Sequence, residues 1–599
     1  VEQDIIDQSV HVDIDQRATT AVLPFIHDPK IKLAPNKDKA LKVYNQQLKK
    51  LSQNNADKEA VIESEGKLQT LGHVDFVRNL SAYQQQKLQD SHIQNFIPWR
   101  VVFKGNSMTT PCRLVFDASQ STSSGYSLND LLAKGRNNMN RLQEILIRWS
   151  MHQSAFHTDV RKMYNSVKLR EEDWCYQRYV WQQELDPMKI PEEKVIKTII
   201  YGVRSSGNQA ERGLRQTAEL SKQEYPNVCR IIQRDVYVDD CLSGANSDDT
   251  CKQLADELEI VMNRGGFGLK GITFSGEDPP ENLSEDGISI SVAGQRWFPK
   301  DDVLCLDISE LNFAKKVRGR KVIDDSTKQI PERLTRRHCV SKAGEVFDLT
   351  GKVTPITAAI KLDLHELVKI KLDWDDVLPD NLRPIWISHF QMIQELKHLR
   401  YKRAIVPKDA INLNITTIDF GDASRSMACS SIYARFERKN GDYSCQLVLA
   451  RSKLISHGES QPRAELTAAV LNTHTGEVVR KAYGEHHKGA IKLSDSEIVL
   501  HWILNDQKML KQWVRDRVIE VRRLTETNQW YHVESQNMLA DIGTRKGAKI
   551  KDVSETSRWI QGDDWMKKKT SEMPIRSLKD VQLSSKDKEE ALKEMPHQT

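Results

Sequence analysis

The sequence predicts a multidomain α+β protein, and three observations lead to this expectation. The chain has 599 residues, which corresponds to about four domains at roughly 150 residues each. Hydrophobic residues make up 39% and charged residues 29%, the composition of an ordinary folded protein. Short segments of alternating apolar residues are separated by helical segments, and this mixed order favours sheets that carry helices on one face.

Composition limits the functions to be considered. The formal net charge is only +5, so any interaction with nucleic acid must rest on local sites rather than on overall charge. No stretch approaches the roughly 18 apolar residues of a membrane span, so we expect no membrane partner. The nine cysteines form no CxxC pair, which argues against a disulfide scaffold or a zinc ribbon and favours a reducing cytosolic or nuclear setting.

The N-terminal half predicts helices first and then strands. Residues 1–95 have a polar, helical pattern, and residues 96–118 predict two strands joined by a turn. A helix capped by Ser127 is expected next, within SLNDLLAKGRNNMNRLQEILIRWS. Strands are expected at SAFHTDV and WCYQRYVW, then a helix after YGVRSSGNQAE and a hairpin at RDVYVDDCLSG.

The C-terminal half begins with basic clusters. Residues 310–404 contain KKVRGRK, RLTRRH and LKHLRYKR. Each cluster alone is best explained as a solvated face, whereas together they favour a surface that follows phosphates. A second alternating β region starts near residue 405, and the last stretch of about thirty polar and charged residues predicts a flexible tail.

Paired aspartates mark the predicted hairpin. Asp239 and Asp240 follow one apolar strand, and Asp159 ends another. Because neighbouring strands lie about 4.8 Å apart, carboxylates at their ends can converge on one point. Two like charges about 4 Å apart repel by roughly 1–4 kcal/mol, and hard cations bound by oxygen would offset this repulsion. A pair of aspartates in a turn is more often only a turn, so these residues alone leave both interpretations open.

A second set of acids lies at predicted element ends in the C-terminal half. Asp422 ends a strand, Glu465 lies in the first turn of a helix, Asp495 joins a strand to a helix, and Asp541 lies in a later helix. Each acid alone is equally well explained as a solvated side chain. Glu465 in particular is ordinary, because the positive end of the helix dipole favours an acid there.

Taken together, these segments resemble a known family. YVDD resembles the YxDD box of reverse transcriptases, FHTDVRKMY their first palm motif and YGVRSSGNQAE the next. The stretches CRLVFDAS, GGFGLKGITFSG, GQRWFPKDD and FDLTGKVTPITAAIKL are similar to the Pao/BEL class of LTR retrotransposons. The later blocks DAS, PRAEL, SDSE with LHW, and NMLAD resemble the RNase H of that class. The likeness covers about residues 20–565.

The resemblance implies a right-hand polymerase with fingers, palm and thumb, a connection, and a C-terminal RNase H-like α/β domain. The corresponding ranges are 1–95 for an N-terminal extension and the start of the fingers, 96–300 for fingers and palm with the polymerase site, 301–404 for thumb and connection, 405–550 for RNase H, and 551–599 for a C-terminal helix and flexible tail.

The resemblance also assigns roles in a polymerase site. Asp159 and Asp239 would ligate two Mg²⁺ ions, Asp240 would support the site, and the backbone carbonyl of Val160 would face a metal. Tyr164 stands where the family has an aromatic steric gate, whose ring would crowd the 2′-OH of an incoming nucleotide. A core aromatic is the alternative for Tyr164.

Further residues match positions that bind the nucleotide or the primer. Arg113 would contact the incoming triphosphate with help from Lys104, and Lys270 would lie near the departing pyrophosphate. Gly202 would let the backbone approach nucleotide and template, and Trp297 lies in a stretch that resembles the primer grip. Surface charge is the alternative for Arg113 and Lys270.

In the C-terminal half, the acids follow the D-E-D-D order of RNase H. Asp422, Glu465, Asp495 and Asp541 would hold two further Mg²⁺ ions, with Mn²⁺ as a substitute, for hydrolysis of the RNA strand of a hybrid. No separate long basic helix for hybrid binding is recognised, so the grip on a hybrid would come mostly from the polymerase half.

The implied function is an RNA- and DNA-directed DNA polymerase with RNase H. Its partners would be an RNA template, a DNA primer, the RNA–DNA hybrid and dNTPs, with a host tRNA as the primer that the class suggests. A virus-like particle in the cytoplasm is the expected location, with the nucleus as the alternative. A catalytically silent scaffold subunit that binds nucleic acid is the alternative function.

The two ends of the chain suggest part of a polyprotein. It starts at Val1 in an acidic stretch without the apolar core of a signal peptide, which a processed fragment and an arbitrary boundary explain equally well. No protease DTG or DSG box precedes residue 95, and no integrase pattern follows residue 545. We therefore expect the polymerase and RNase H portion of a longer polyprotein.

Overall fold

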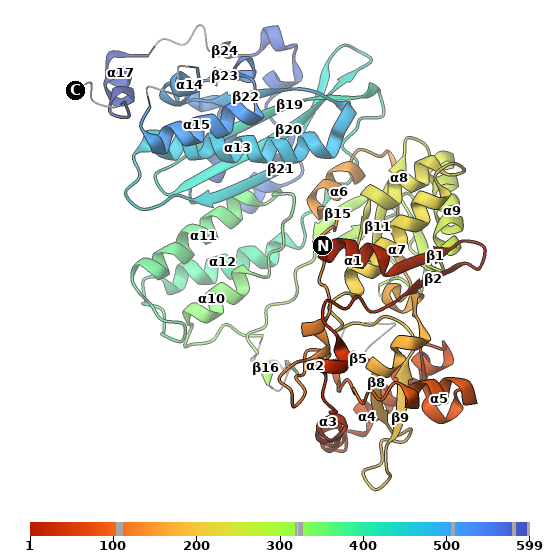
Figure 1. Cartoon of the computed structure of the whole chain (residues 1–599). Helices are drawn as coiled ribbons and strands as arrows, with labels where there is room; N and C mark the ends of the chain where they lie inside the picture. Colours follow the sequence, from red (N-terminus) through yellow and green to blue (C-terminus); the bar gives the residue numbers. More distant parts are fainter. Residues whose placement is uncertain are drawn as a thin grey trace.

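The computed structural model describes residues 1–103, 112–284, 286–314, 316–317, 320–321, 328–504, 510–577 and 583–595. Figure 1 shows the N-terminal half, in red to yellow, beside a C-terminal sheet in cyan and blue, with helices α10–α12 in green against that sheet. The predicted multidomain α+β class is confirmed by these separate sheets and their covering helices. None of the described helices combines the length and apolar character needed to cross a membrane.

A four-stranded antiparallel sheet forms the centre of the N-terminal half. Its strand order is β10–β11–β6–β12. The run SAFHTDV is buried along almost its whole length as β6, with its polar residues Ser154, His157 and Thr158 included. The predicted strand and hairpin are both confirmed. The strands are β6 (Ser154–Val160), β10 (Val236–Tyr237), β11 (Asp240–Ala245) and β12 (Leu269–Phe274).

Helices cover this sheet. Helix α9 packs on β6 and β11, with α8 and α7 beside it (Figure 1). The Ser247 hydroxyl accepts a hydrogen bond from the Thr250 amide and so caps the start of α9, and Gly265 ends the helix. The helix predicted after YGVRSSGNQAE is confirmed as α7. The helices are α7 (Ser206–Ser221), α8 (Pro226–Arg234) and α9 (Asp248–Arg264).

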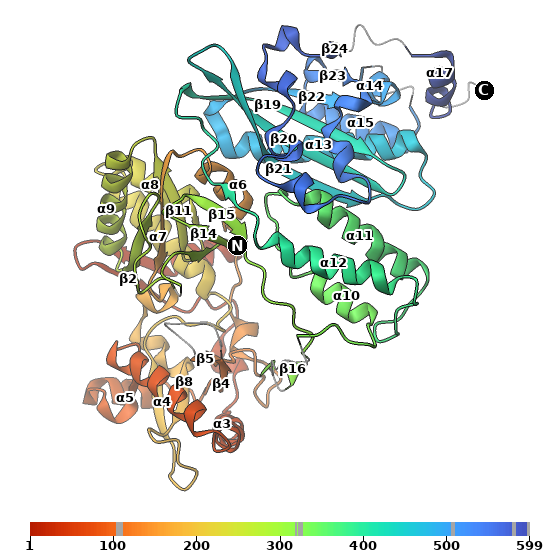
Figure 2. The same cartoon turned by 180° about the vertical axis from the view of Figure 1, so that it is seen from behind.

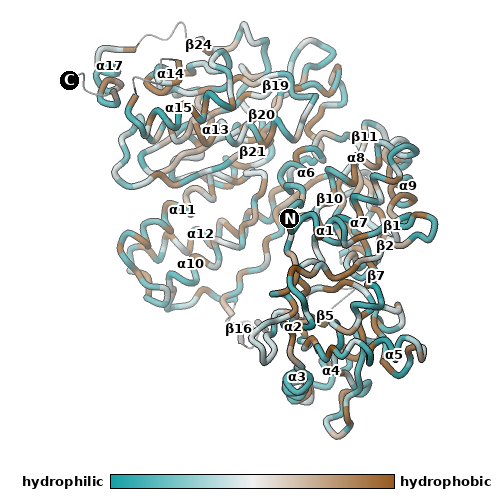
Figure 3. The backbone as a smooth tube through the Cα atoms, viewed as in Figure 1, coloured by the Kyte–Doolittle hydropathy of each residue, from teal (hydrophilic) through white to brown (hydrophobic). Residues whose placement is uncertain are grey.

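Residues 1–95 contain strands as well as helices. The helical prediction is right for α3 (Lys37–Leu51), which carries mostly hydrophilic residues in Figure 3, and it is wrong for three strands. β1 (Val10–Asp13) forms a local hairpin with β2 (Ala18–Ala21). The other pairings join segments more than a hundred residues apart, which a local pattern does not reveal: β2 pairs with β7 (Val167–Leu169), and β3 (Val74–Phe76) pairs with β9 (Glu192–Ile196).

Two predictions between residues 96 and 300 need correction. Ser127 caps a single 3₁₀ turn, Leu128–Leu131, and α6 (Leu142–Trp149) begins only after Gly135, whose φ of +72° interrupts a helix. The strand expected at WCYQRYVW is reduced to β8 (Arg178–Trp181), because Glu171–Tyr176 form a 3₁₀ helix. The two strands predicted between residues 96 and 118 are present as the hairpin β4 (Trp99–Phe103) and β5 (Cys112–Phe116).

Helices α10–α12 share a core with the C-terminal domain. Ile356 of α11 and Phe390 of α12 belong to the same hydrophobic cluster as Phe420 and Tyr433 of the sheet. Figures 1 and 2 view the molecule from opposite sides, and both show α11 lying against this sheet. The elements of this segment are β13 (Ile290–Val292), β14 (Gln295–Phe298), β15 (Val303–Leu306), α10 (Arg336–Ala343), α11 (Thr354–Lys369), α12 (Arg383–Leu396) and β18 (Tyr401–Lys402).

The C-terminal domain is a six-stranded mixed sheet of order β21–β20–β19–β22–β23–β24. Helix α13 packs on β19 and β20, and α15 packs on α13. The parallel neighbours of this sheet are β19, β22 and β23, so the C-terminal ends of these strands meet at one edge. The elements are β19 (Ala410–Ala423), β20 (Met427–Arg438), β21 (Tyr443–Leu454), α13 (Gln461–Tyr483), β22 (His487–Ser494), α14 (Glu497–Leu504), α15 (Gln512–Leu524) and β23 (Trp530–Val533).

The prediction of a flexible C-terminal tail is wrong for two described segments. β24 (Ile575–Ser577) pairs with β23 and forms the edge of the sheet. The segment around α17 (Ser585–Leu592) is held by an ion pair between Arg463 and Glu594, with nitrogen–oxygen distances of 2.7 and 2.9 Å. The polar composition hid both contacts. The domain boundaries inferred above remain predictions.

Candidate active sites

The first site lies where the hairpin turn meets the end of β6. Asp240 stands directly opposite Asp159 in the antiparallel register, and the amide of Val160 donates a hydrogen bond to the carbonyl of Asp239 at 2.8 Å. Val238 in the turn adopts φ +56°, which is uncommon for a β-branched residue. The three aspartates predicted to converge therefore do meet.

Electrostatics at these aspartates reflect crowding of like charge. The pKa of Asp159 is raised, because the effect of burial exceeds that of the hydrogen bond from Lys270, which lowers it. Burial and then the neighbouring Asp240 raise the pKa of Asp239. Lys270 Nζ lies 2.8 Å from both carboxylate oxygens of Asp159, and His157 Nε2 lies 3.1 Å from Asp240 Oδ1. The cluster thus carries its own counter-charge.

Two tyrosines lie beside the aspartates. The rings of Tyr164 and Tyr201 are 4.3 Å apart between centroids and tilted by 51°. Burial, followed by the charge of Asp239, raises the pKa of Tyr164 and raises that of Tyr201 to about 12. Both phenols are therefore neutral. Tyr201 was missed by the sequence analysis, although its place directly before Gly202 was a usable signal.

Gly202 is required by its surroundings. Its φ is +104°, and a Cβ at this position would lie 1.9 Å from the carbonyl oxygen of Phe116 at the end of β5. Only glycine permits so close an approach of two backbones. Gly202 therefore sets the distance between the fingers hairpin and the segment that carries Tyr201.

The remaining predicted residues of this half have different outcomes. Arg113, exposed on β5, is close enough to Asp239 for its charge to lower the pKa of that carboxyl. Lys104 lies outside the described residues. Lys270 contacts Asp159 directly instead of standing free for a phosphate. The indole of Trp297 is fully buried, packs on Trp149 at 5.0 Å and donates to Asp302, and the assignment of its stretch to a primer grip stays a prediction.

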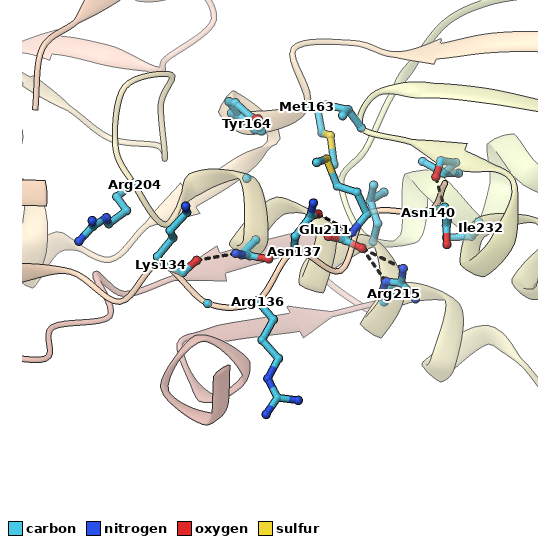
Figure 4. A pocket seen from close by; sticks show the side chains of 17 residues that line it. Lys134, Arg136, Asn137, Asn140, Met163, Tyr164, Arg204, Glu211, Arg215 and Ile232 are labelled. Atoms are coloured by element: carbon cyan, nitrogen blue, oxygen red, sulfur yellow. Dashed lines mark hydrogen bonds and ion pairs between the residues drawn. The ribbon is translucent and has the colours of Figure 1, made fainter. Parts of the chain in front are cut away.

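A cavity of about 360 Å³ opens next to Tyr164. Figure 4 shows Tyr164 and Met163 on one side of it, with charged and amide side chains and also apolar ones such as Ile232 around the rest. Glu211 is paired with Arg215 at 2.8 Å, which leaves an excess of positive charge in the lining. The cationic and amide side chains that line it are Lys134, Arg136, Arg204, Arg215, Asn137, Asn140 and Asn208.

The second site gathers acids from three elements of the C-terminal sheet. Asp422 near the end of β19, Glu465 in the first turns of α13 and Asp495 after β22 each offer a carboxylate oxygen, and these atoms lie within 4.8 Å of one another. The parallel arrangement of β19 and β22 produces this meeting, because both strands end at the same edge. The predicted convergence of these three acids is therefore observed.

Asp541 flanks this cluster on a 3₁₀ turn, Leu539–Gly543. Arg545 Nε lies 2.6 Å from Asp541 Oδ1. Burial raises the pKa of Asp541, and Asp495 adds to the rise, whereas Arg545 opposes it. We call residues 541–546 the acid loop. Asp541 is not one of the three mutually close carboxylates, but it lies close enough to Asp495 for the charge of that residue to raise its pKa.

Burial leaves Asp422 and Glu465 short of charge compensation. It raises the pKa of Asp422 to about 7 and that of Glu465 to about 9, and repulsion from neighbouring carboxylates adds to both rises. The hydrogen bonds that they accept come from neutral donors, namely Thr544 Oγ1 at 3.0 Å to Asp422, and Gln461 at 2.6 Å and the Ala423 amide at 3.1 Å to Glu465. Such a set of oxygen donors fits a divalent hard cation.

Thr544 and Gln461 were missed by the sequence analysis. Gln461 lies four residues before Glu465, so helical spacing alone would have placed both side chains on one face. Thr544 follows Asp541 by three residues, within a turn that the sequence presents as part of a helix. Its contact with Asp422 joins segments 122 residues apart, which no local pattern reveals.

The C-terminal sheet and its acids define an RNase H-like domain. The family model of the Pao retrotransposon-like RNaseH-like domain matches residues 335–496, which confirms the predicted resemblance over that part of the chain. The match starts at α10, so it joins helices α10–α12 to the sheet as one segment.

Other comparisons are weaker. No curated protein matches the sequence. Among solved structures, the foamy viral protease-reverse transcriptase in complex with dsDNA is 12% identical with a TM-score of 0.48, covering 80% of this chain and 83% of that one. The same viral protein with RNA/DNA hybrid is 13% identical with a TM-score of 0.46, covering 77% of this chain and 52% of that one. At these values the likeness carries no weight for the sites, which rest on their own geometry.

Proposed function

We propose that the chain is the reverse transcriptase of a Pao/BEL-class retrotransposon, with an RNA- and DNA-directed DNA polymerase site and an RNase H site. The observation that supports this most is the presence of two separate acid clusters in one chain. Asp159, Asp239 and Asp240 meet in one sheet, and Asp422, Glu465 and Asp495 meet in another.

In the polymerase site, each residue has a proposed task. Asp159 and Asp239 would hold two Mg²⁺ ions, with Asp240 in support. When bound, the ions would stabilise the attacking and leaving oxygens as the primer 3′-OH displaces pyrophosphate from the α-phosphate. Arg113, whose charge acts on Asp239, would contact a triphosphate held there. Tyr164, backed by the ring of Tyr201, would exclude a 2′-OH.

Nucleic acid would lie against the cavity beside Tyr164. Its cationic lining suits phosphate oxygens, its amides suit base or sugar edges, and Met163 and Tyr164 offer apolar contact. The excess of positive charge left by the Glu211–Arg215 pair supports a polyanionic ligand rather than a neutral one. We propose that the template and primer strands occupy this surface next to the aspartates.

In the RNase H site, Asp422, Glu465 and Asp495 would hold two Mg²⁺ ions or Mn²⁺, with Asp541 at the edge. Thr544 and Gln461 orient two of these carboxylates by donating to them, which keeps their remaining oxygens directed at one point. The substrate would be the RNA strand of an RNA–DNA hybrid made by the polymerase site.

Primer extension on an end-labelled RNA template tests both halves at once. With Mg²⁺ and dNTPs, we expect extended DNA together with shortened RNA. An Asp239→Asn/Asp240→Asn double variant should lose extension and still shorten the RNA of a preformed hybrid. A folded chain that binds hybrid but extends nothing would favour the silent scaffold instead.

A further inference from the structure

Helix α11 is docked firmly on the RNase H-like sheet. The amide of Ala450 in β21 donates to the carbonyl of Thr350 at 3.0 Å, just before α11. Gly351 has φ +76°, and a Cβ there would lie 2.1 Å from the carbonyl oxygen of Ala450. The indole of Trp559 donates to the carbonyl of Lys352 at 2.9 Å. The start of α11 therefore has a fixed position relative to the sheet.

A buried carboxylate on α11 reaches the acid loop. Asp363 is 8% exposed, and its Oδ1 lies 2.5 Å from Lys546 Nζ while its Oδ2 lies 2.8 Å from His389 Nε2 of α12. Burial alone would raise the pKa of Asp363, but the hydrogen bonds from His389 and Lys546 outweigh it and hold the pKa below its usual value. Asp363 is thus an ionised group that joins two helices to residue 546.

The acid loop has little freedom between this contact and the acids. Thr544 donates to Asp422 at 3.0 Å, and its carbonyl accepts a hydrogen bond from Ser424 at 3.0 Å. A Cβ at Gly543 would lie 2.4 Å from the sulfur of Cys429, so the loop lies directly on β20. A displacement of Lys546 would therefore also move Thr544 and Asp541, which lie in the same short segment.

We propose that Asp363 is a positioning residue for the RNase H site, which holds the acid loop through Lys546 with the support of His389. The expected effect on RNA cleavage rests on the proposed function, whereas the expected effect on the position of the acid loop does not. Helices α10–α12, which the sequence suggested as thumb and connection, would then serve as a supporting part of the RNase H domain. The family match from residue 335 onward agrees with this division.

Hydrogen exchange of the full chain without substrate tests the positioning itself. Lys546→Met and Asp363→Asn should speed amide exchange across residues 541–546 by about fivefold or more, because a tether of the loop is lost. Glu310→Gln, which breaks an exposed ion pair with Lys397 directly after α12, should leave this exchange unchanged. Unchanged exchange in both test variants would overturn the proposal, whether or not the chain cleaves RNA. Lys546 is half-exposed, so Lys546→Met keeps the test valid if Asp363→Asn does not fold.

RNA cleavage then tests the consequence. Each single variant should lower cleavage of a preformed hybrid by about tenfold and raise the Mg²⁺ concentration for half-maximal cleavage, with primer extension unchanged. The double variant should lose no more than either single one, since both remove one interaction. Equal losses of cleavage and extension, or additive losses, would contradict the proposal. A wild-type chain that cleaves no RNA would instead contradict the proposed function and leave the exchange result to decide the positioning.

Discussion

The two acid clusters differ in how their charge is balanced. In the β10–β11–β6–β12 sheet, Lys270 contacts both oxygens of Asp159, and His157 contacts Asp240. In the RNase H-like sheet, Asp422 and Glu465 are more deeply buried and accept hydrogen bonds only from neutral donors among the contacts described above. The pKa of Glu465 rises to about 9 as a result. The first cluster thus has a lysine as a counter-charge, whereas Asp422 and Glu465 in the second depend on a cation or on protons.

This difference has a physical consequence for metal binding. A lysine that neutralises Asp159 competes with a cation for the same oxygens. Protons on Asp422 and Glu465 compete in the same way, but they leave as pH rises. The two sites should therefore respond differently to Mg²⁺ and to pH, and the predictions below use those responses.

The largest expected effect separates the two clusters completely. Asp239→Asn should lower DNA synthesis by on the order of a thousandfold, since several kcal/mol of charge stabilisation would be lost, and should spare RNA cleavage. Asp495→Asn should do the reverse. Parallel primer-extension and hybrid-cleavage assays measure both. If either change abolished both activities in a folded protein, the assignment of two independent sites would be wrong.

A smaller effect is expected at the tyrosine pair. Tyr164→Ala or Tyr164→Val should relax selection against rNTPs by about 10- to 100-fold, because the ring that would meet the 2′-OH is lost. Tyr201→Phe keeps the ring contact and serves as the matched control. Ratios of kcat/KM for dNTP and rNTP report the outcome, and unchanged discrimination in the Tyr164 variants would remove the gate assignment.

Removal of the counter-charge should make the palm cluster resemble the other one. Lys270→Met would lower the Mg²⁺ concentration for half-maximal extension by about tenfold at pH 8, since a competing cation a few Å from Asp159 is lost. The maximal rate should fall if Lys270 also turns to the departing pyrophosphate. Mg²⁺ titrations of extension and cleavage are the measurement, with cleavage as the internal control. An unchanged Mg²⁺ requirement for extension would show that the ion pair does not compete.

The smallest effect concerns stability without metal. The pKa of Glu465 is about 9 in the folded chain, against an ordinary value of 4.5, so the folded state binds a proton that the unfolded state has released. The stability from this group is greatest at low pH and is lost as pH rises toward 9. In EDTA, Tm should fall between pH 6 and pH 8, by roughly 2–4 °C for each kcal/mol lost. Calorimetry should show a smaller fall in Tm over this pH range for Glu465→Gln than for the wild-type chain. An equal fall in Tm would show that groups other than Glu465 cause the pH dependence.

Much of both candidate sites was predictable because their residues sit in locally strong patterns. An alternating strand, a turn and a second strand predict the hairpin at Asp239 and Asp240 without any tertiary contact. β6 is an apolar run that must be buried, which places Asp159 at a sheet edge. For Asp422, Glu465 and Asp495, the D-E-D-D order resembles that of RNase H, and this resemblance implied that the acids share one site.

Other parts were not predictable, because they depend on contacts between distant segments. Lys270 lies 111 residues from Asp159, and nothing in its own stretch indicates an ion pair with the aspartate. Trp297 is aromatic in a motif-like stretch, yet packing against Trp149 places it in the core. β24 pairs with β23 although its composition is that of a tail.

The sequence by itself determined the α+β class and placed the acids at element ends, because both follow from periodicity, and the resemblance of its motifs to a known family marked these acids as two candidate sites. Only the tertiary structure decided how each cluster is balanced and held. Lys270 compensates one cluster, the two most buried acids of the other accept hydrogen bonds from neutral donors, and Asp363 reaches the acid loop from helix α11. The reason is physical, since pKa values and loop positions depend on neighbours in space that the order of residues along the chain does not specify.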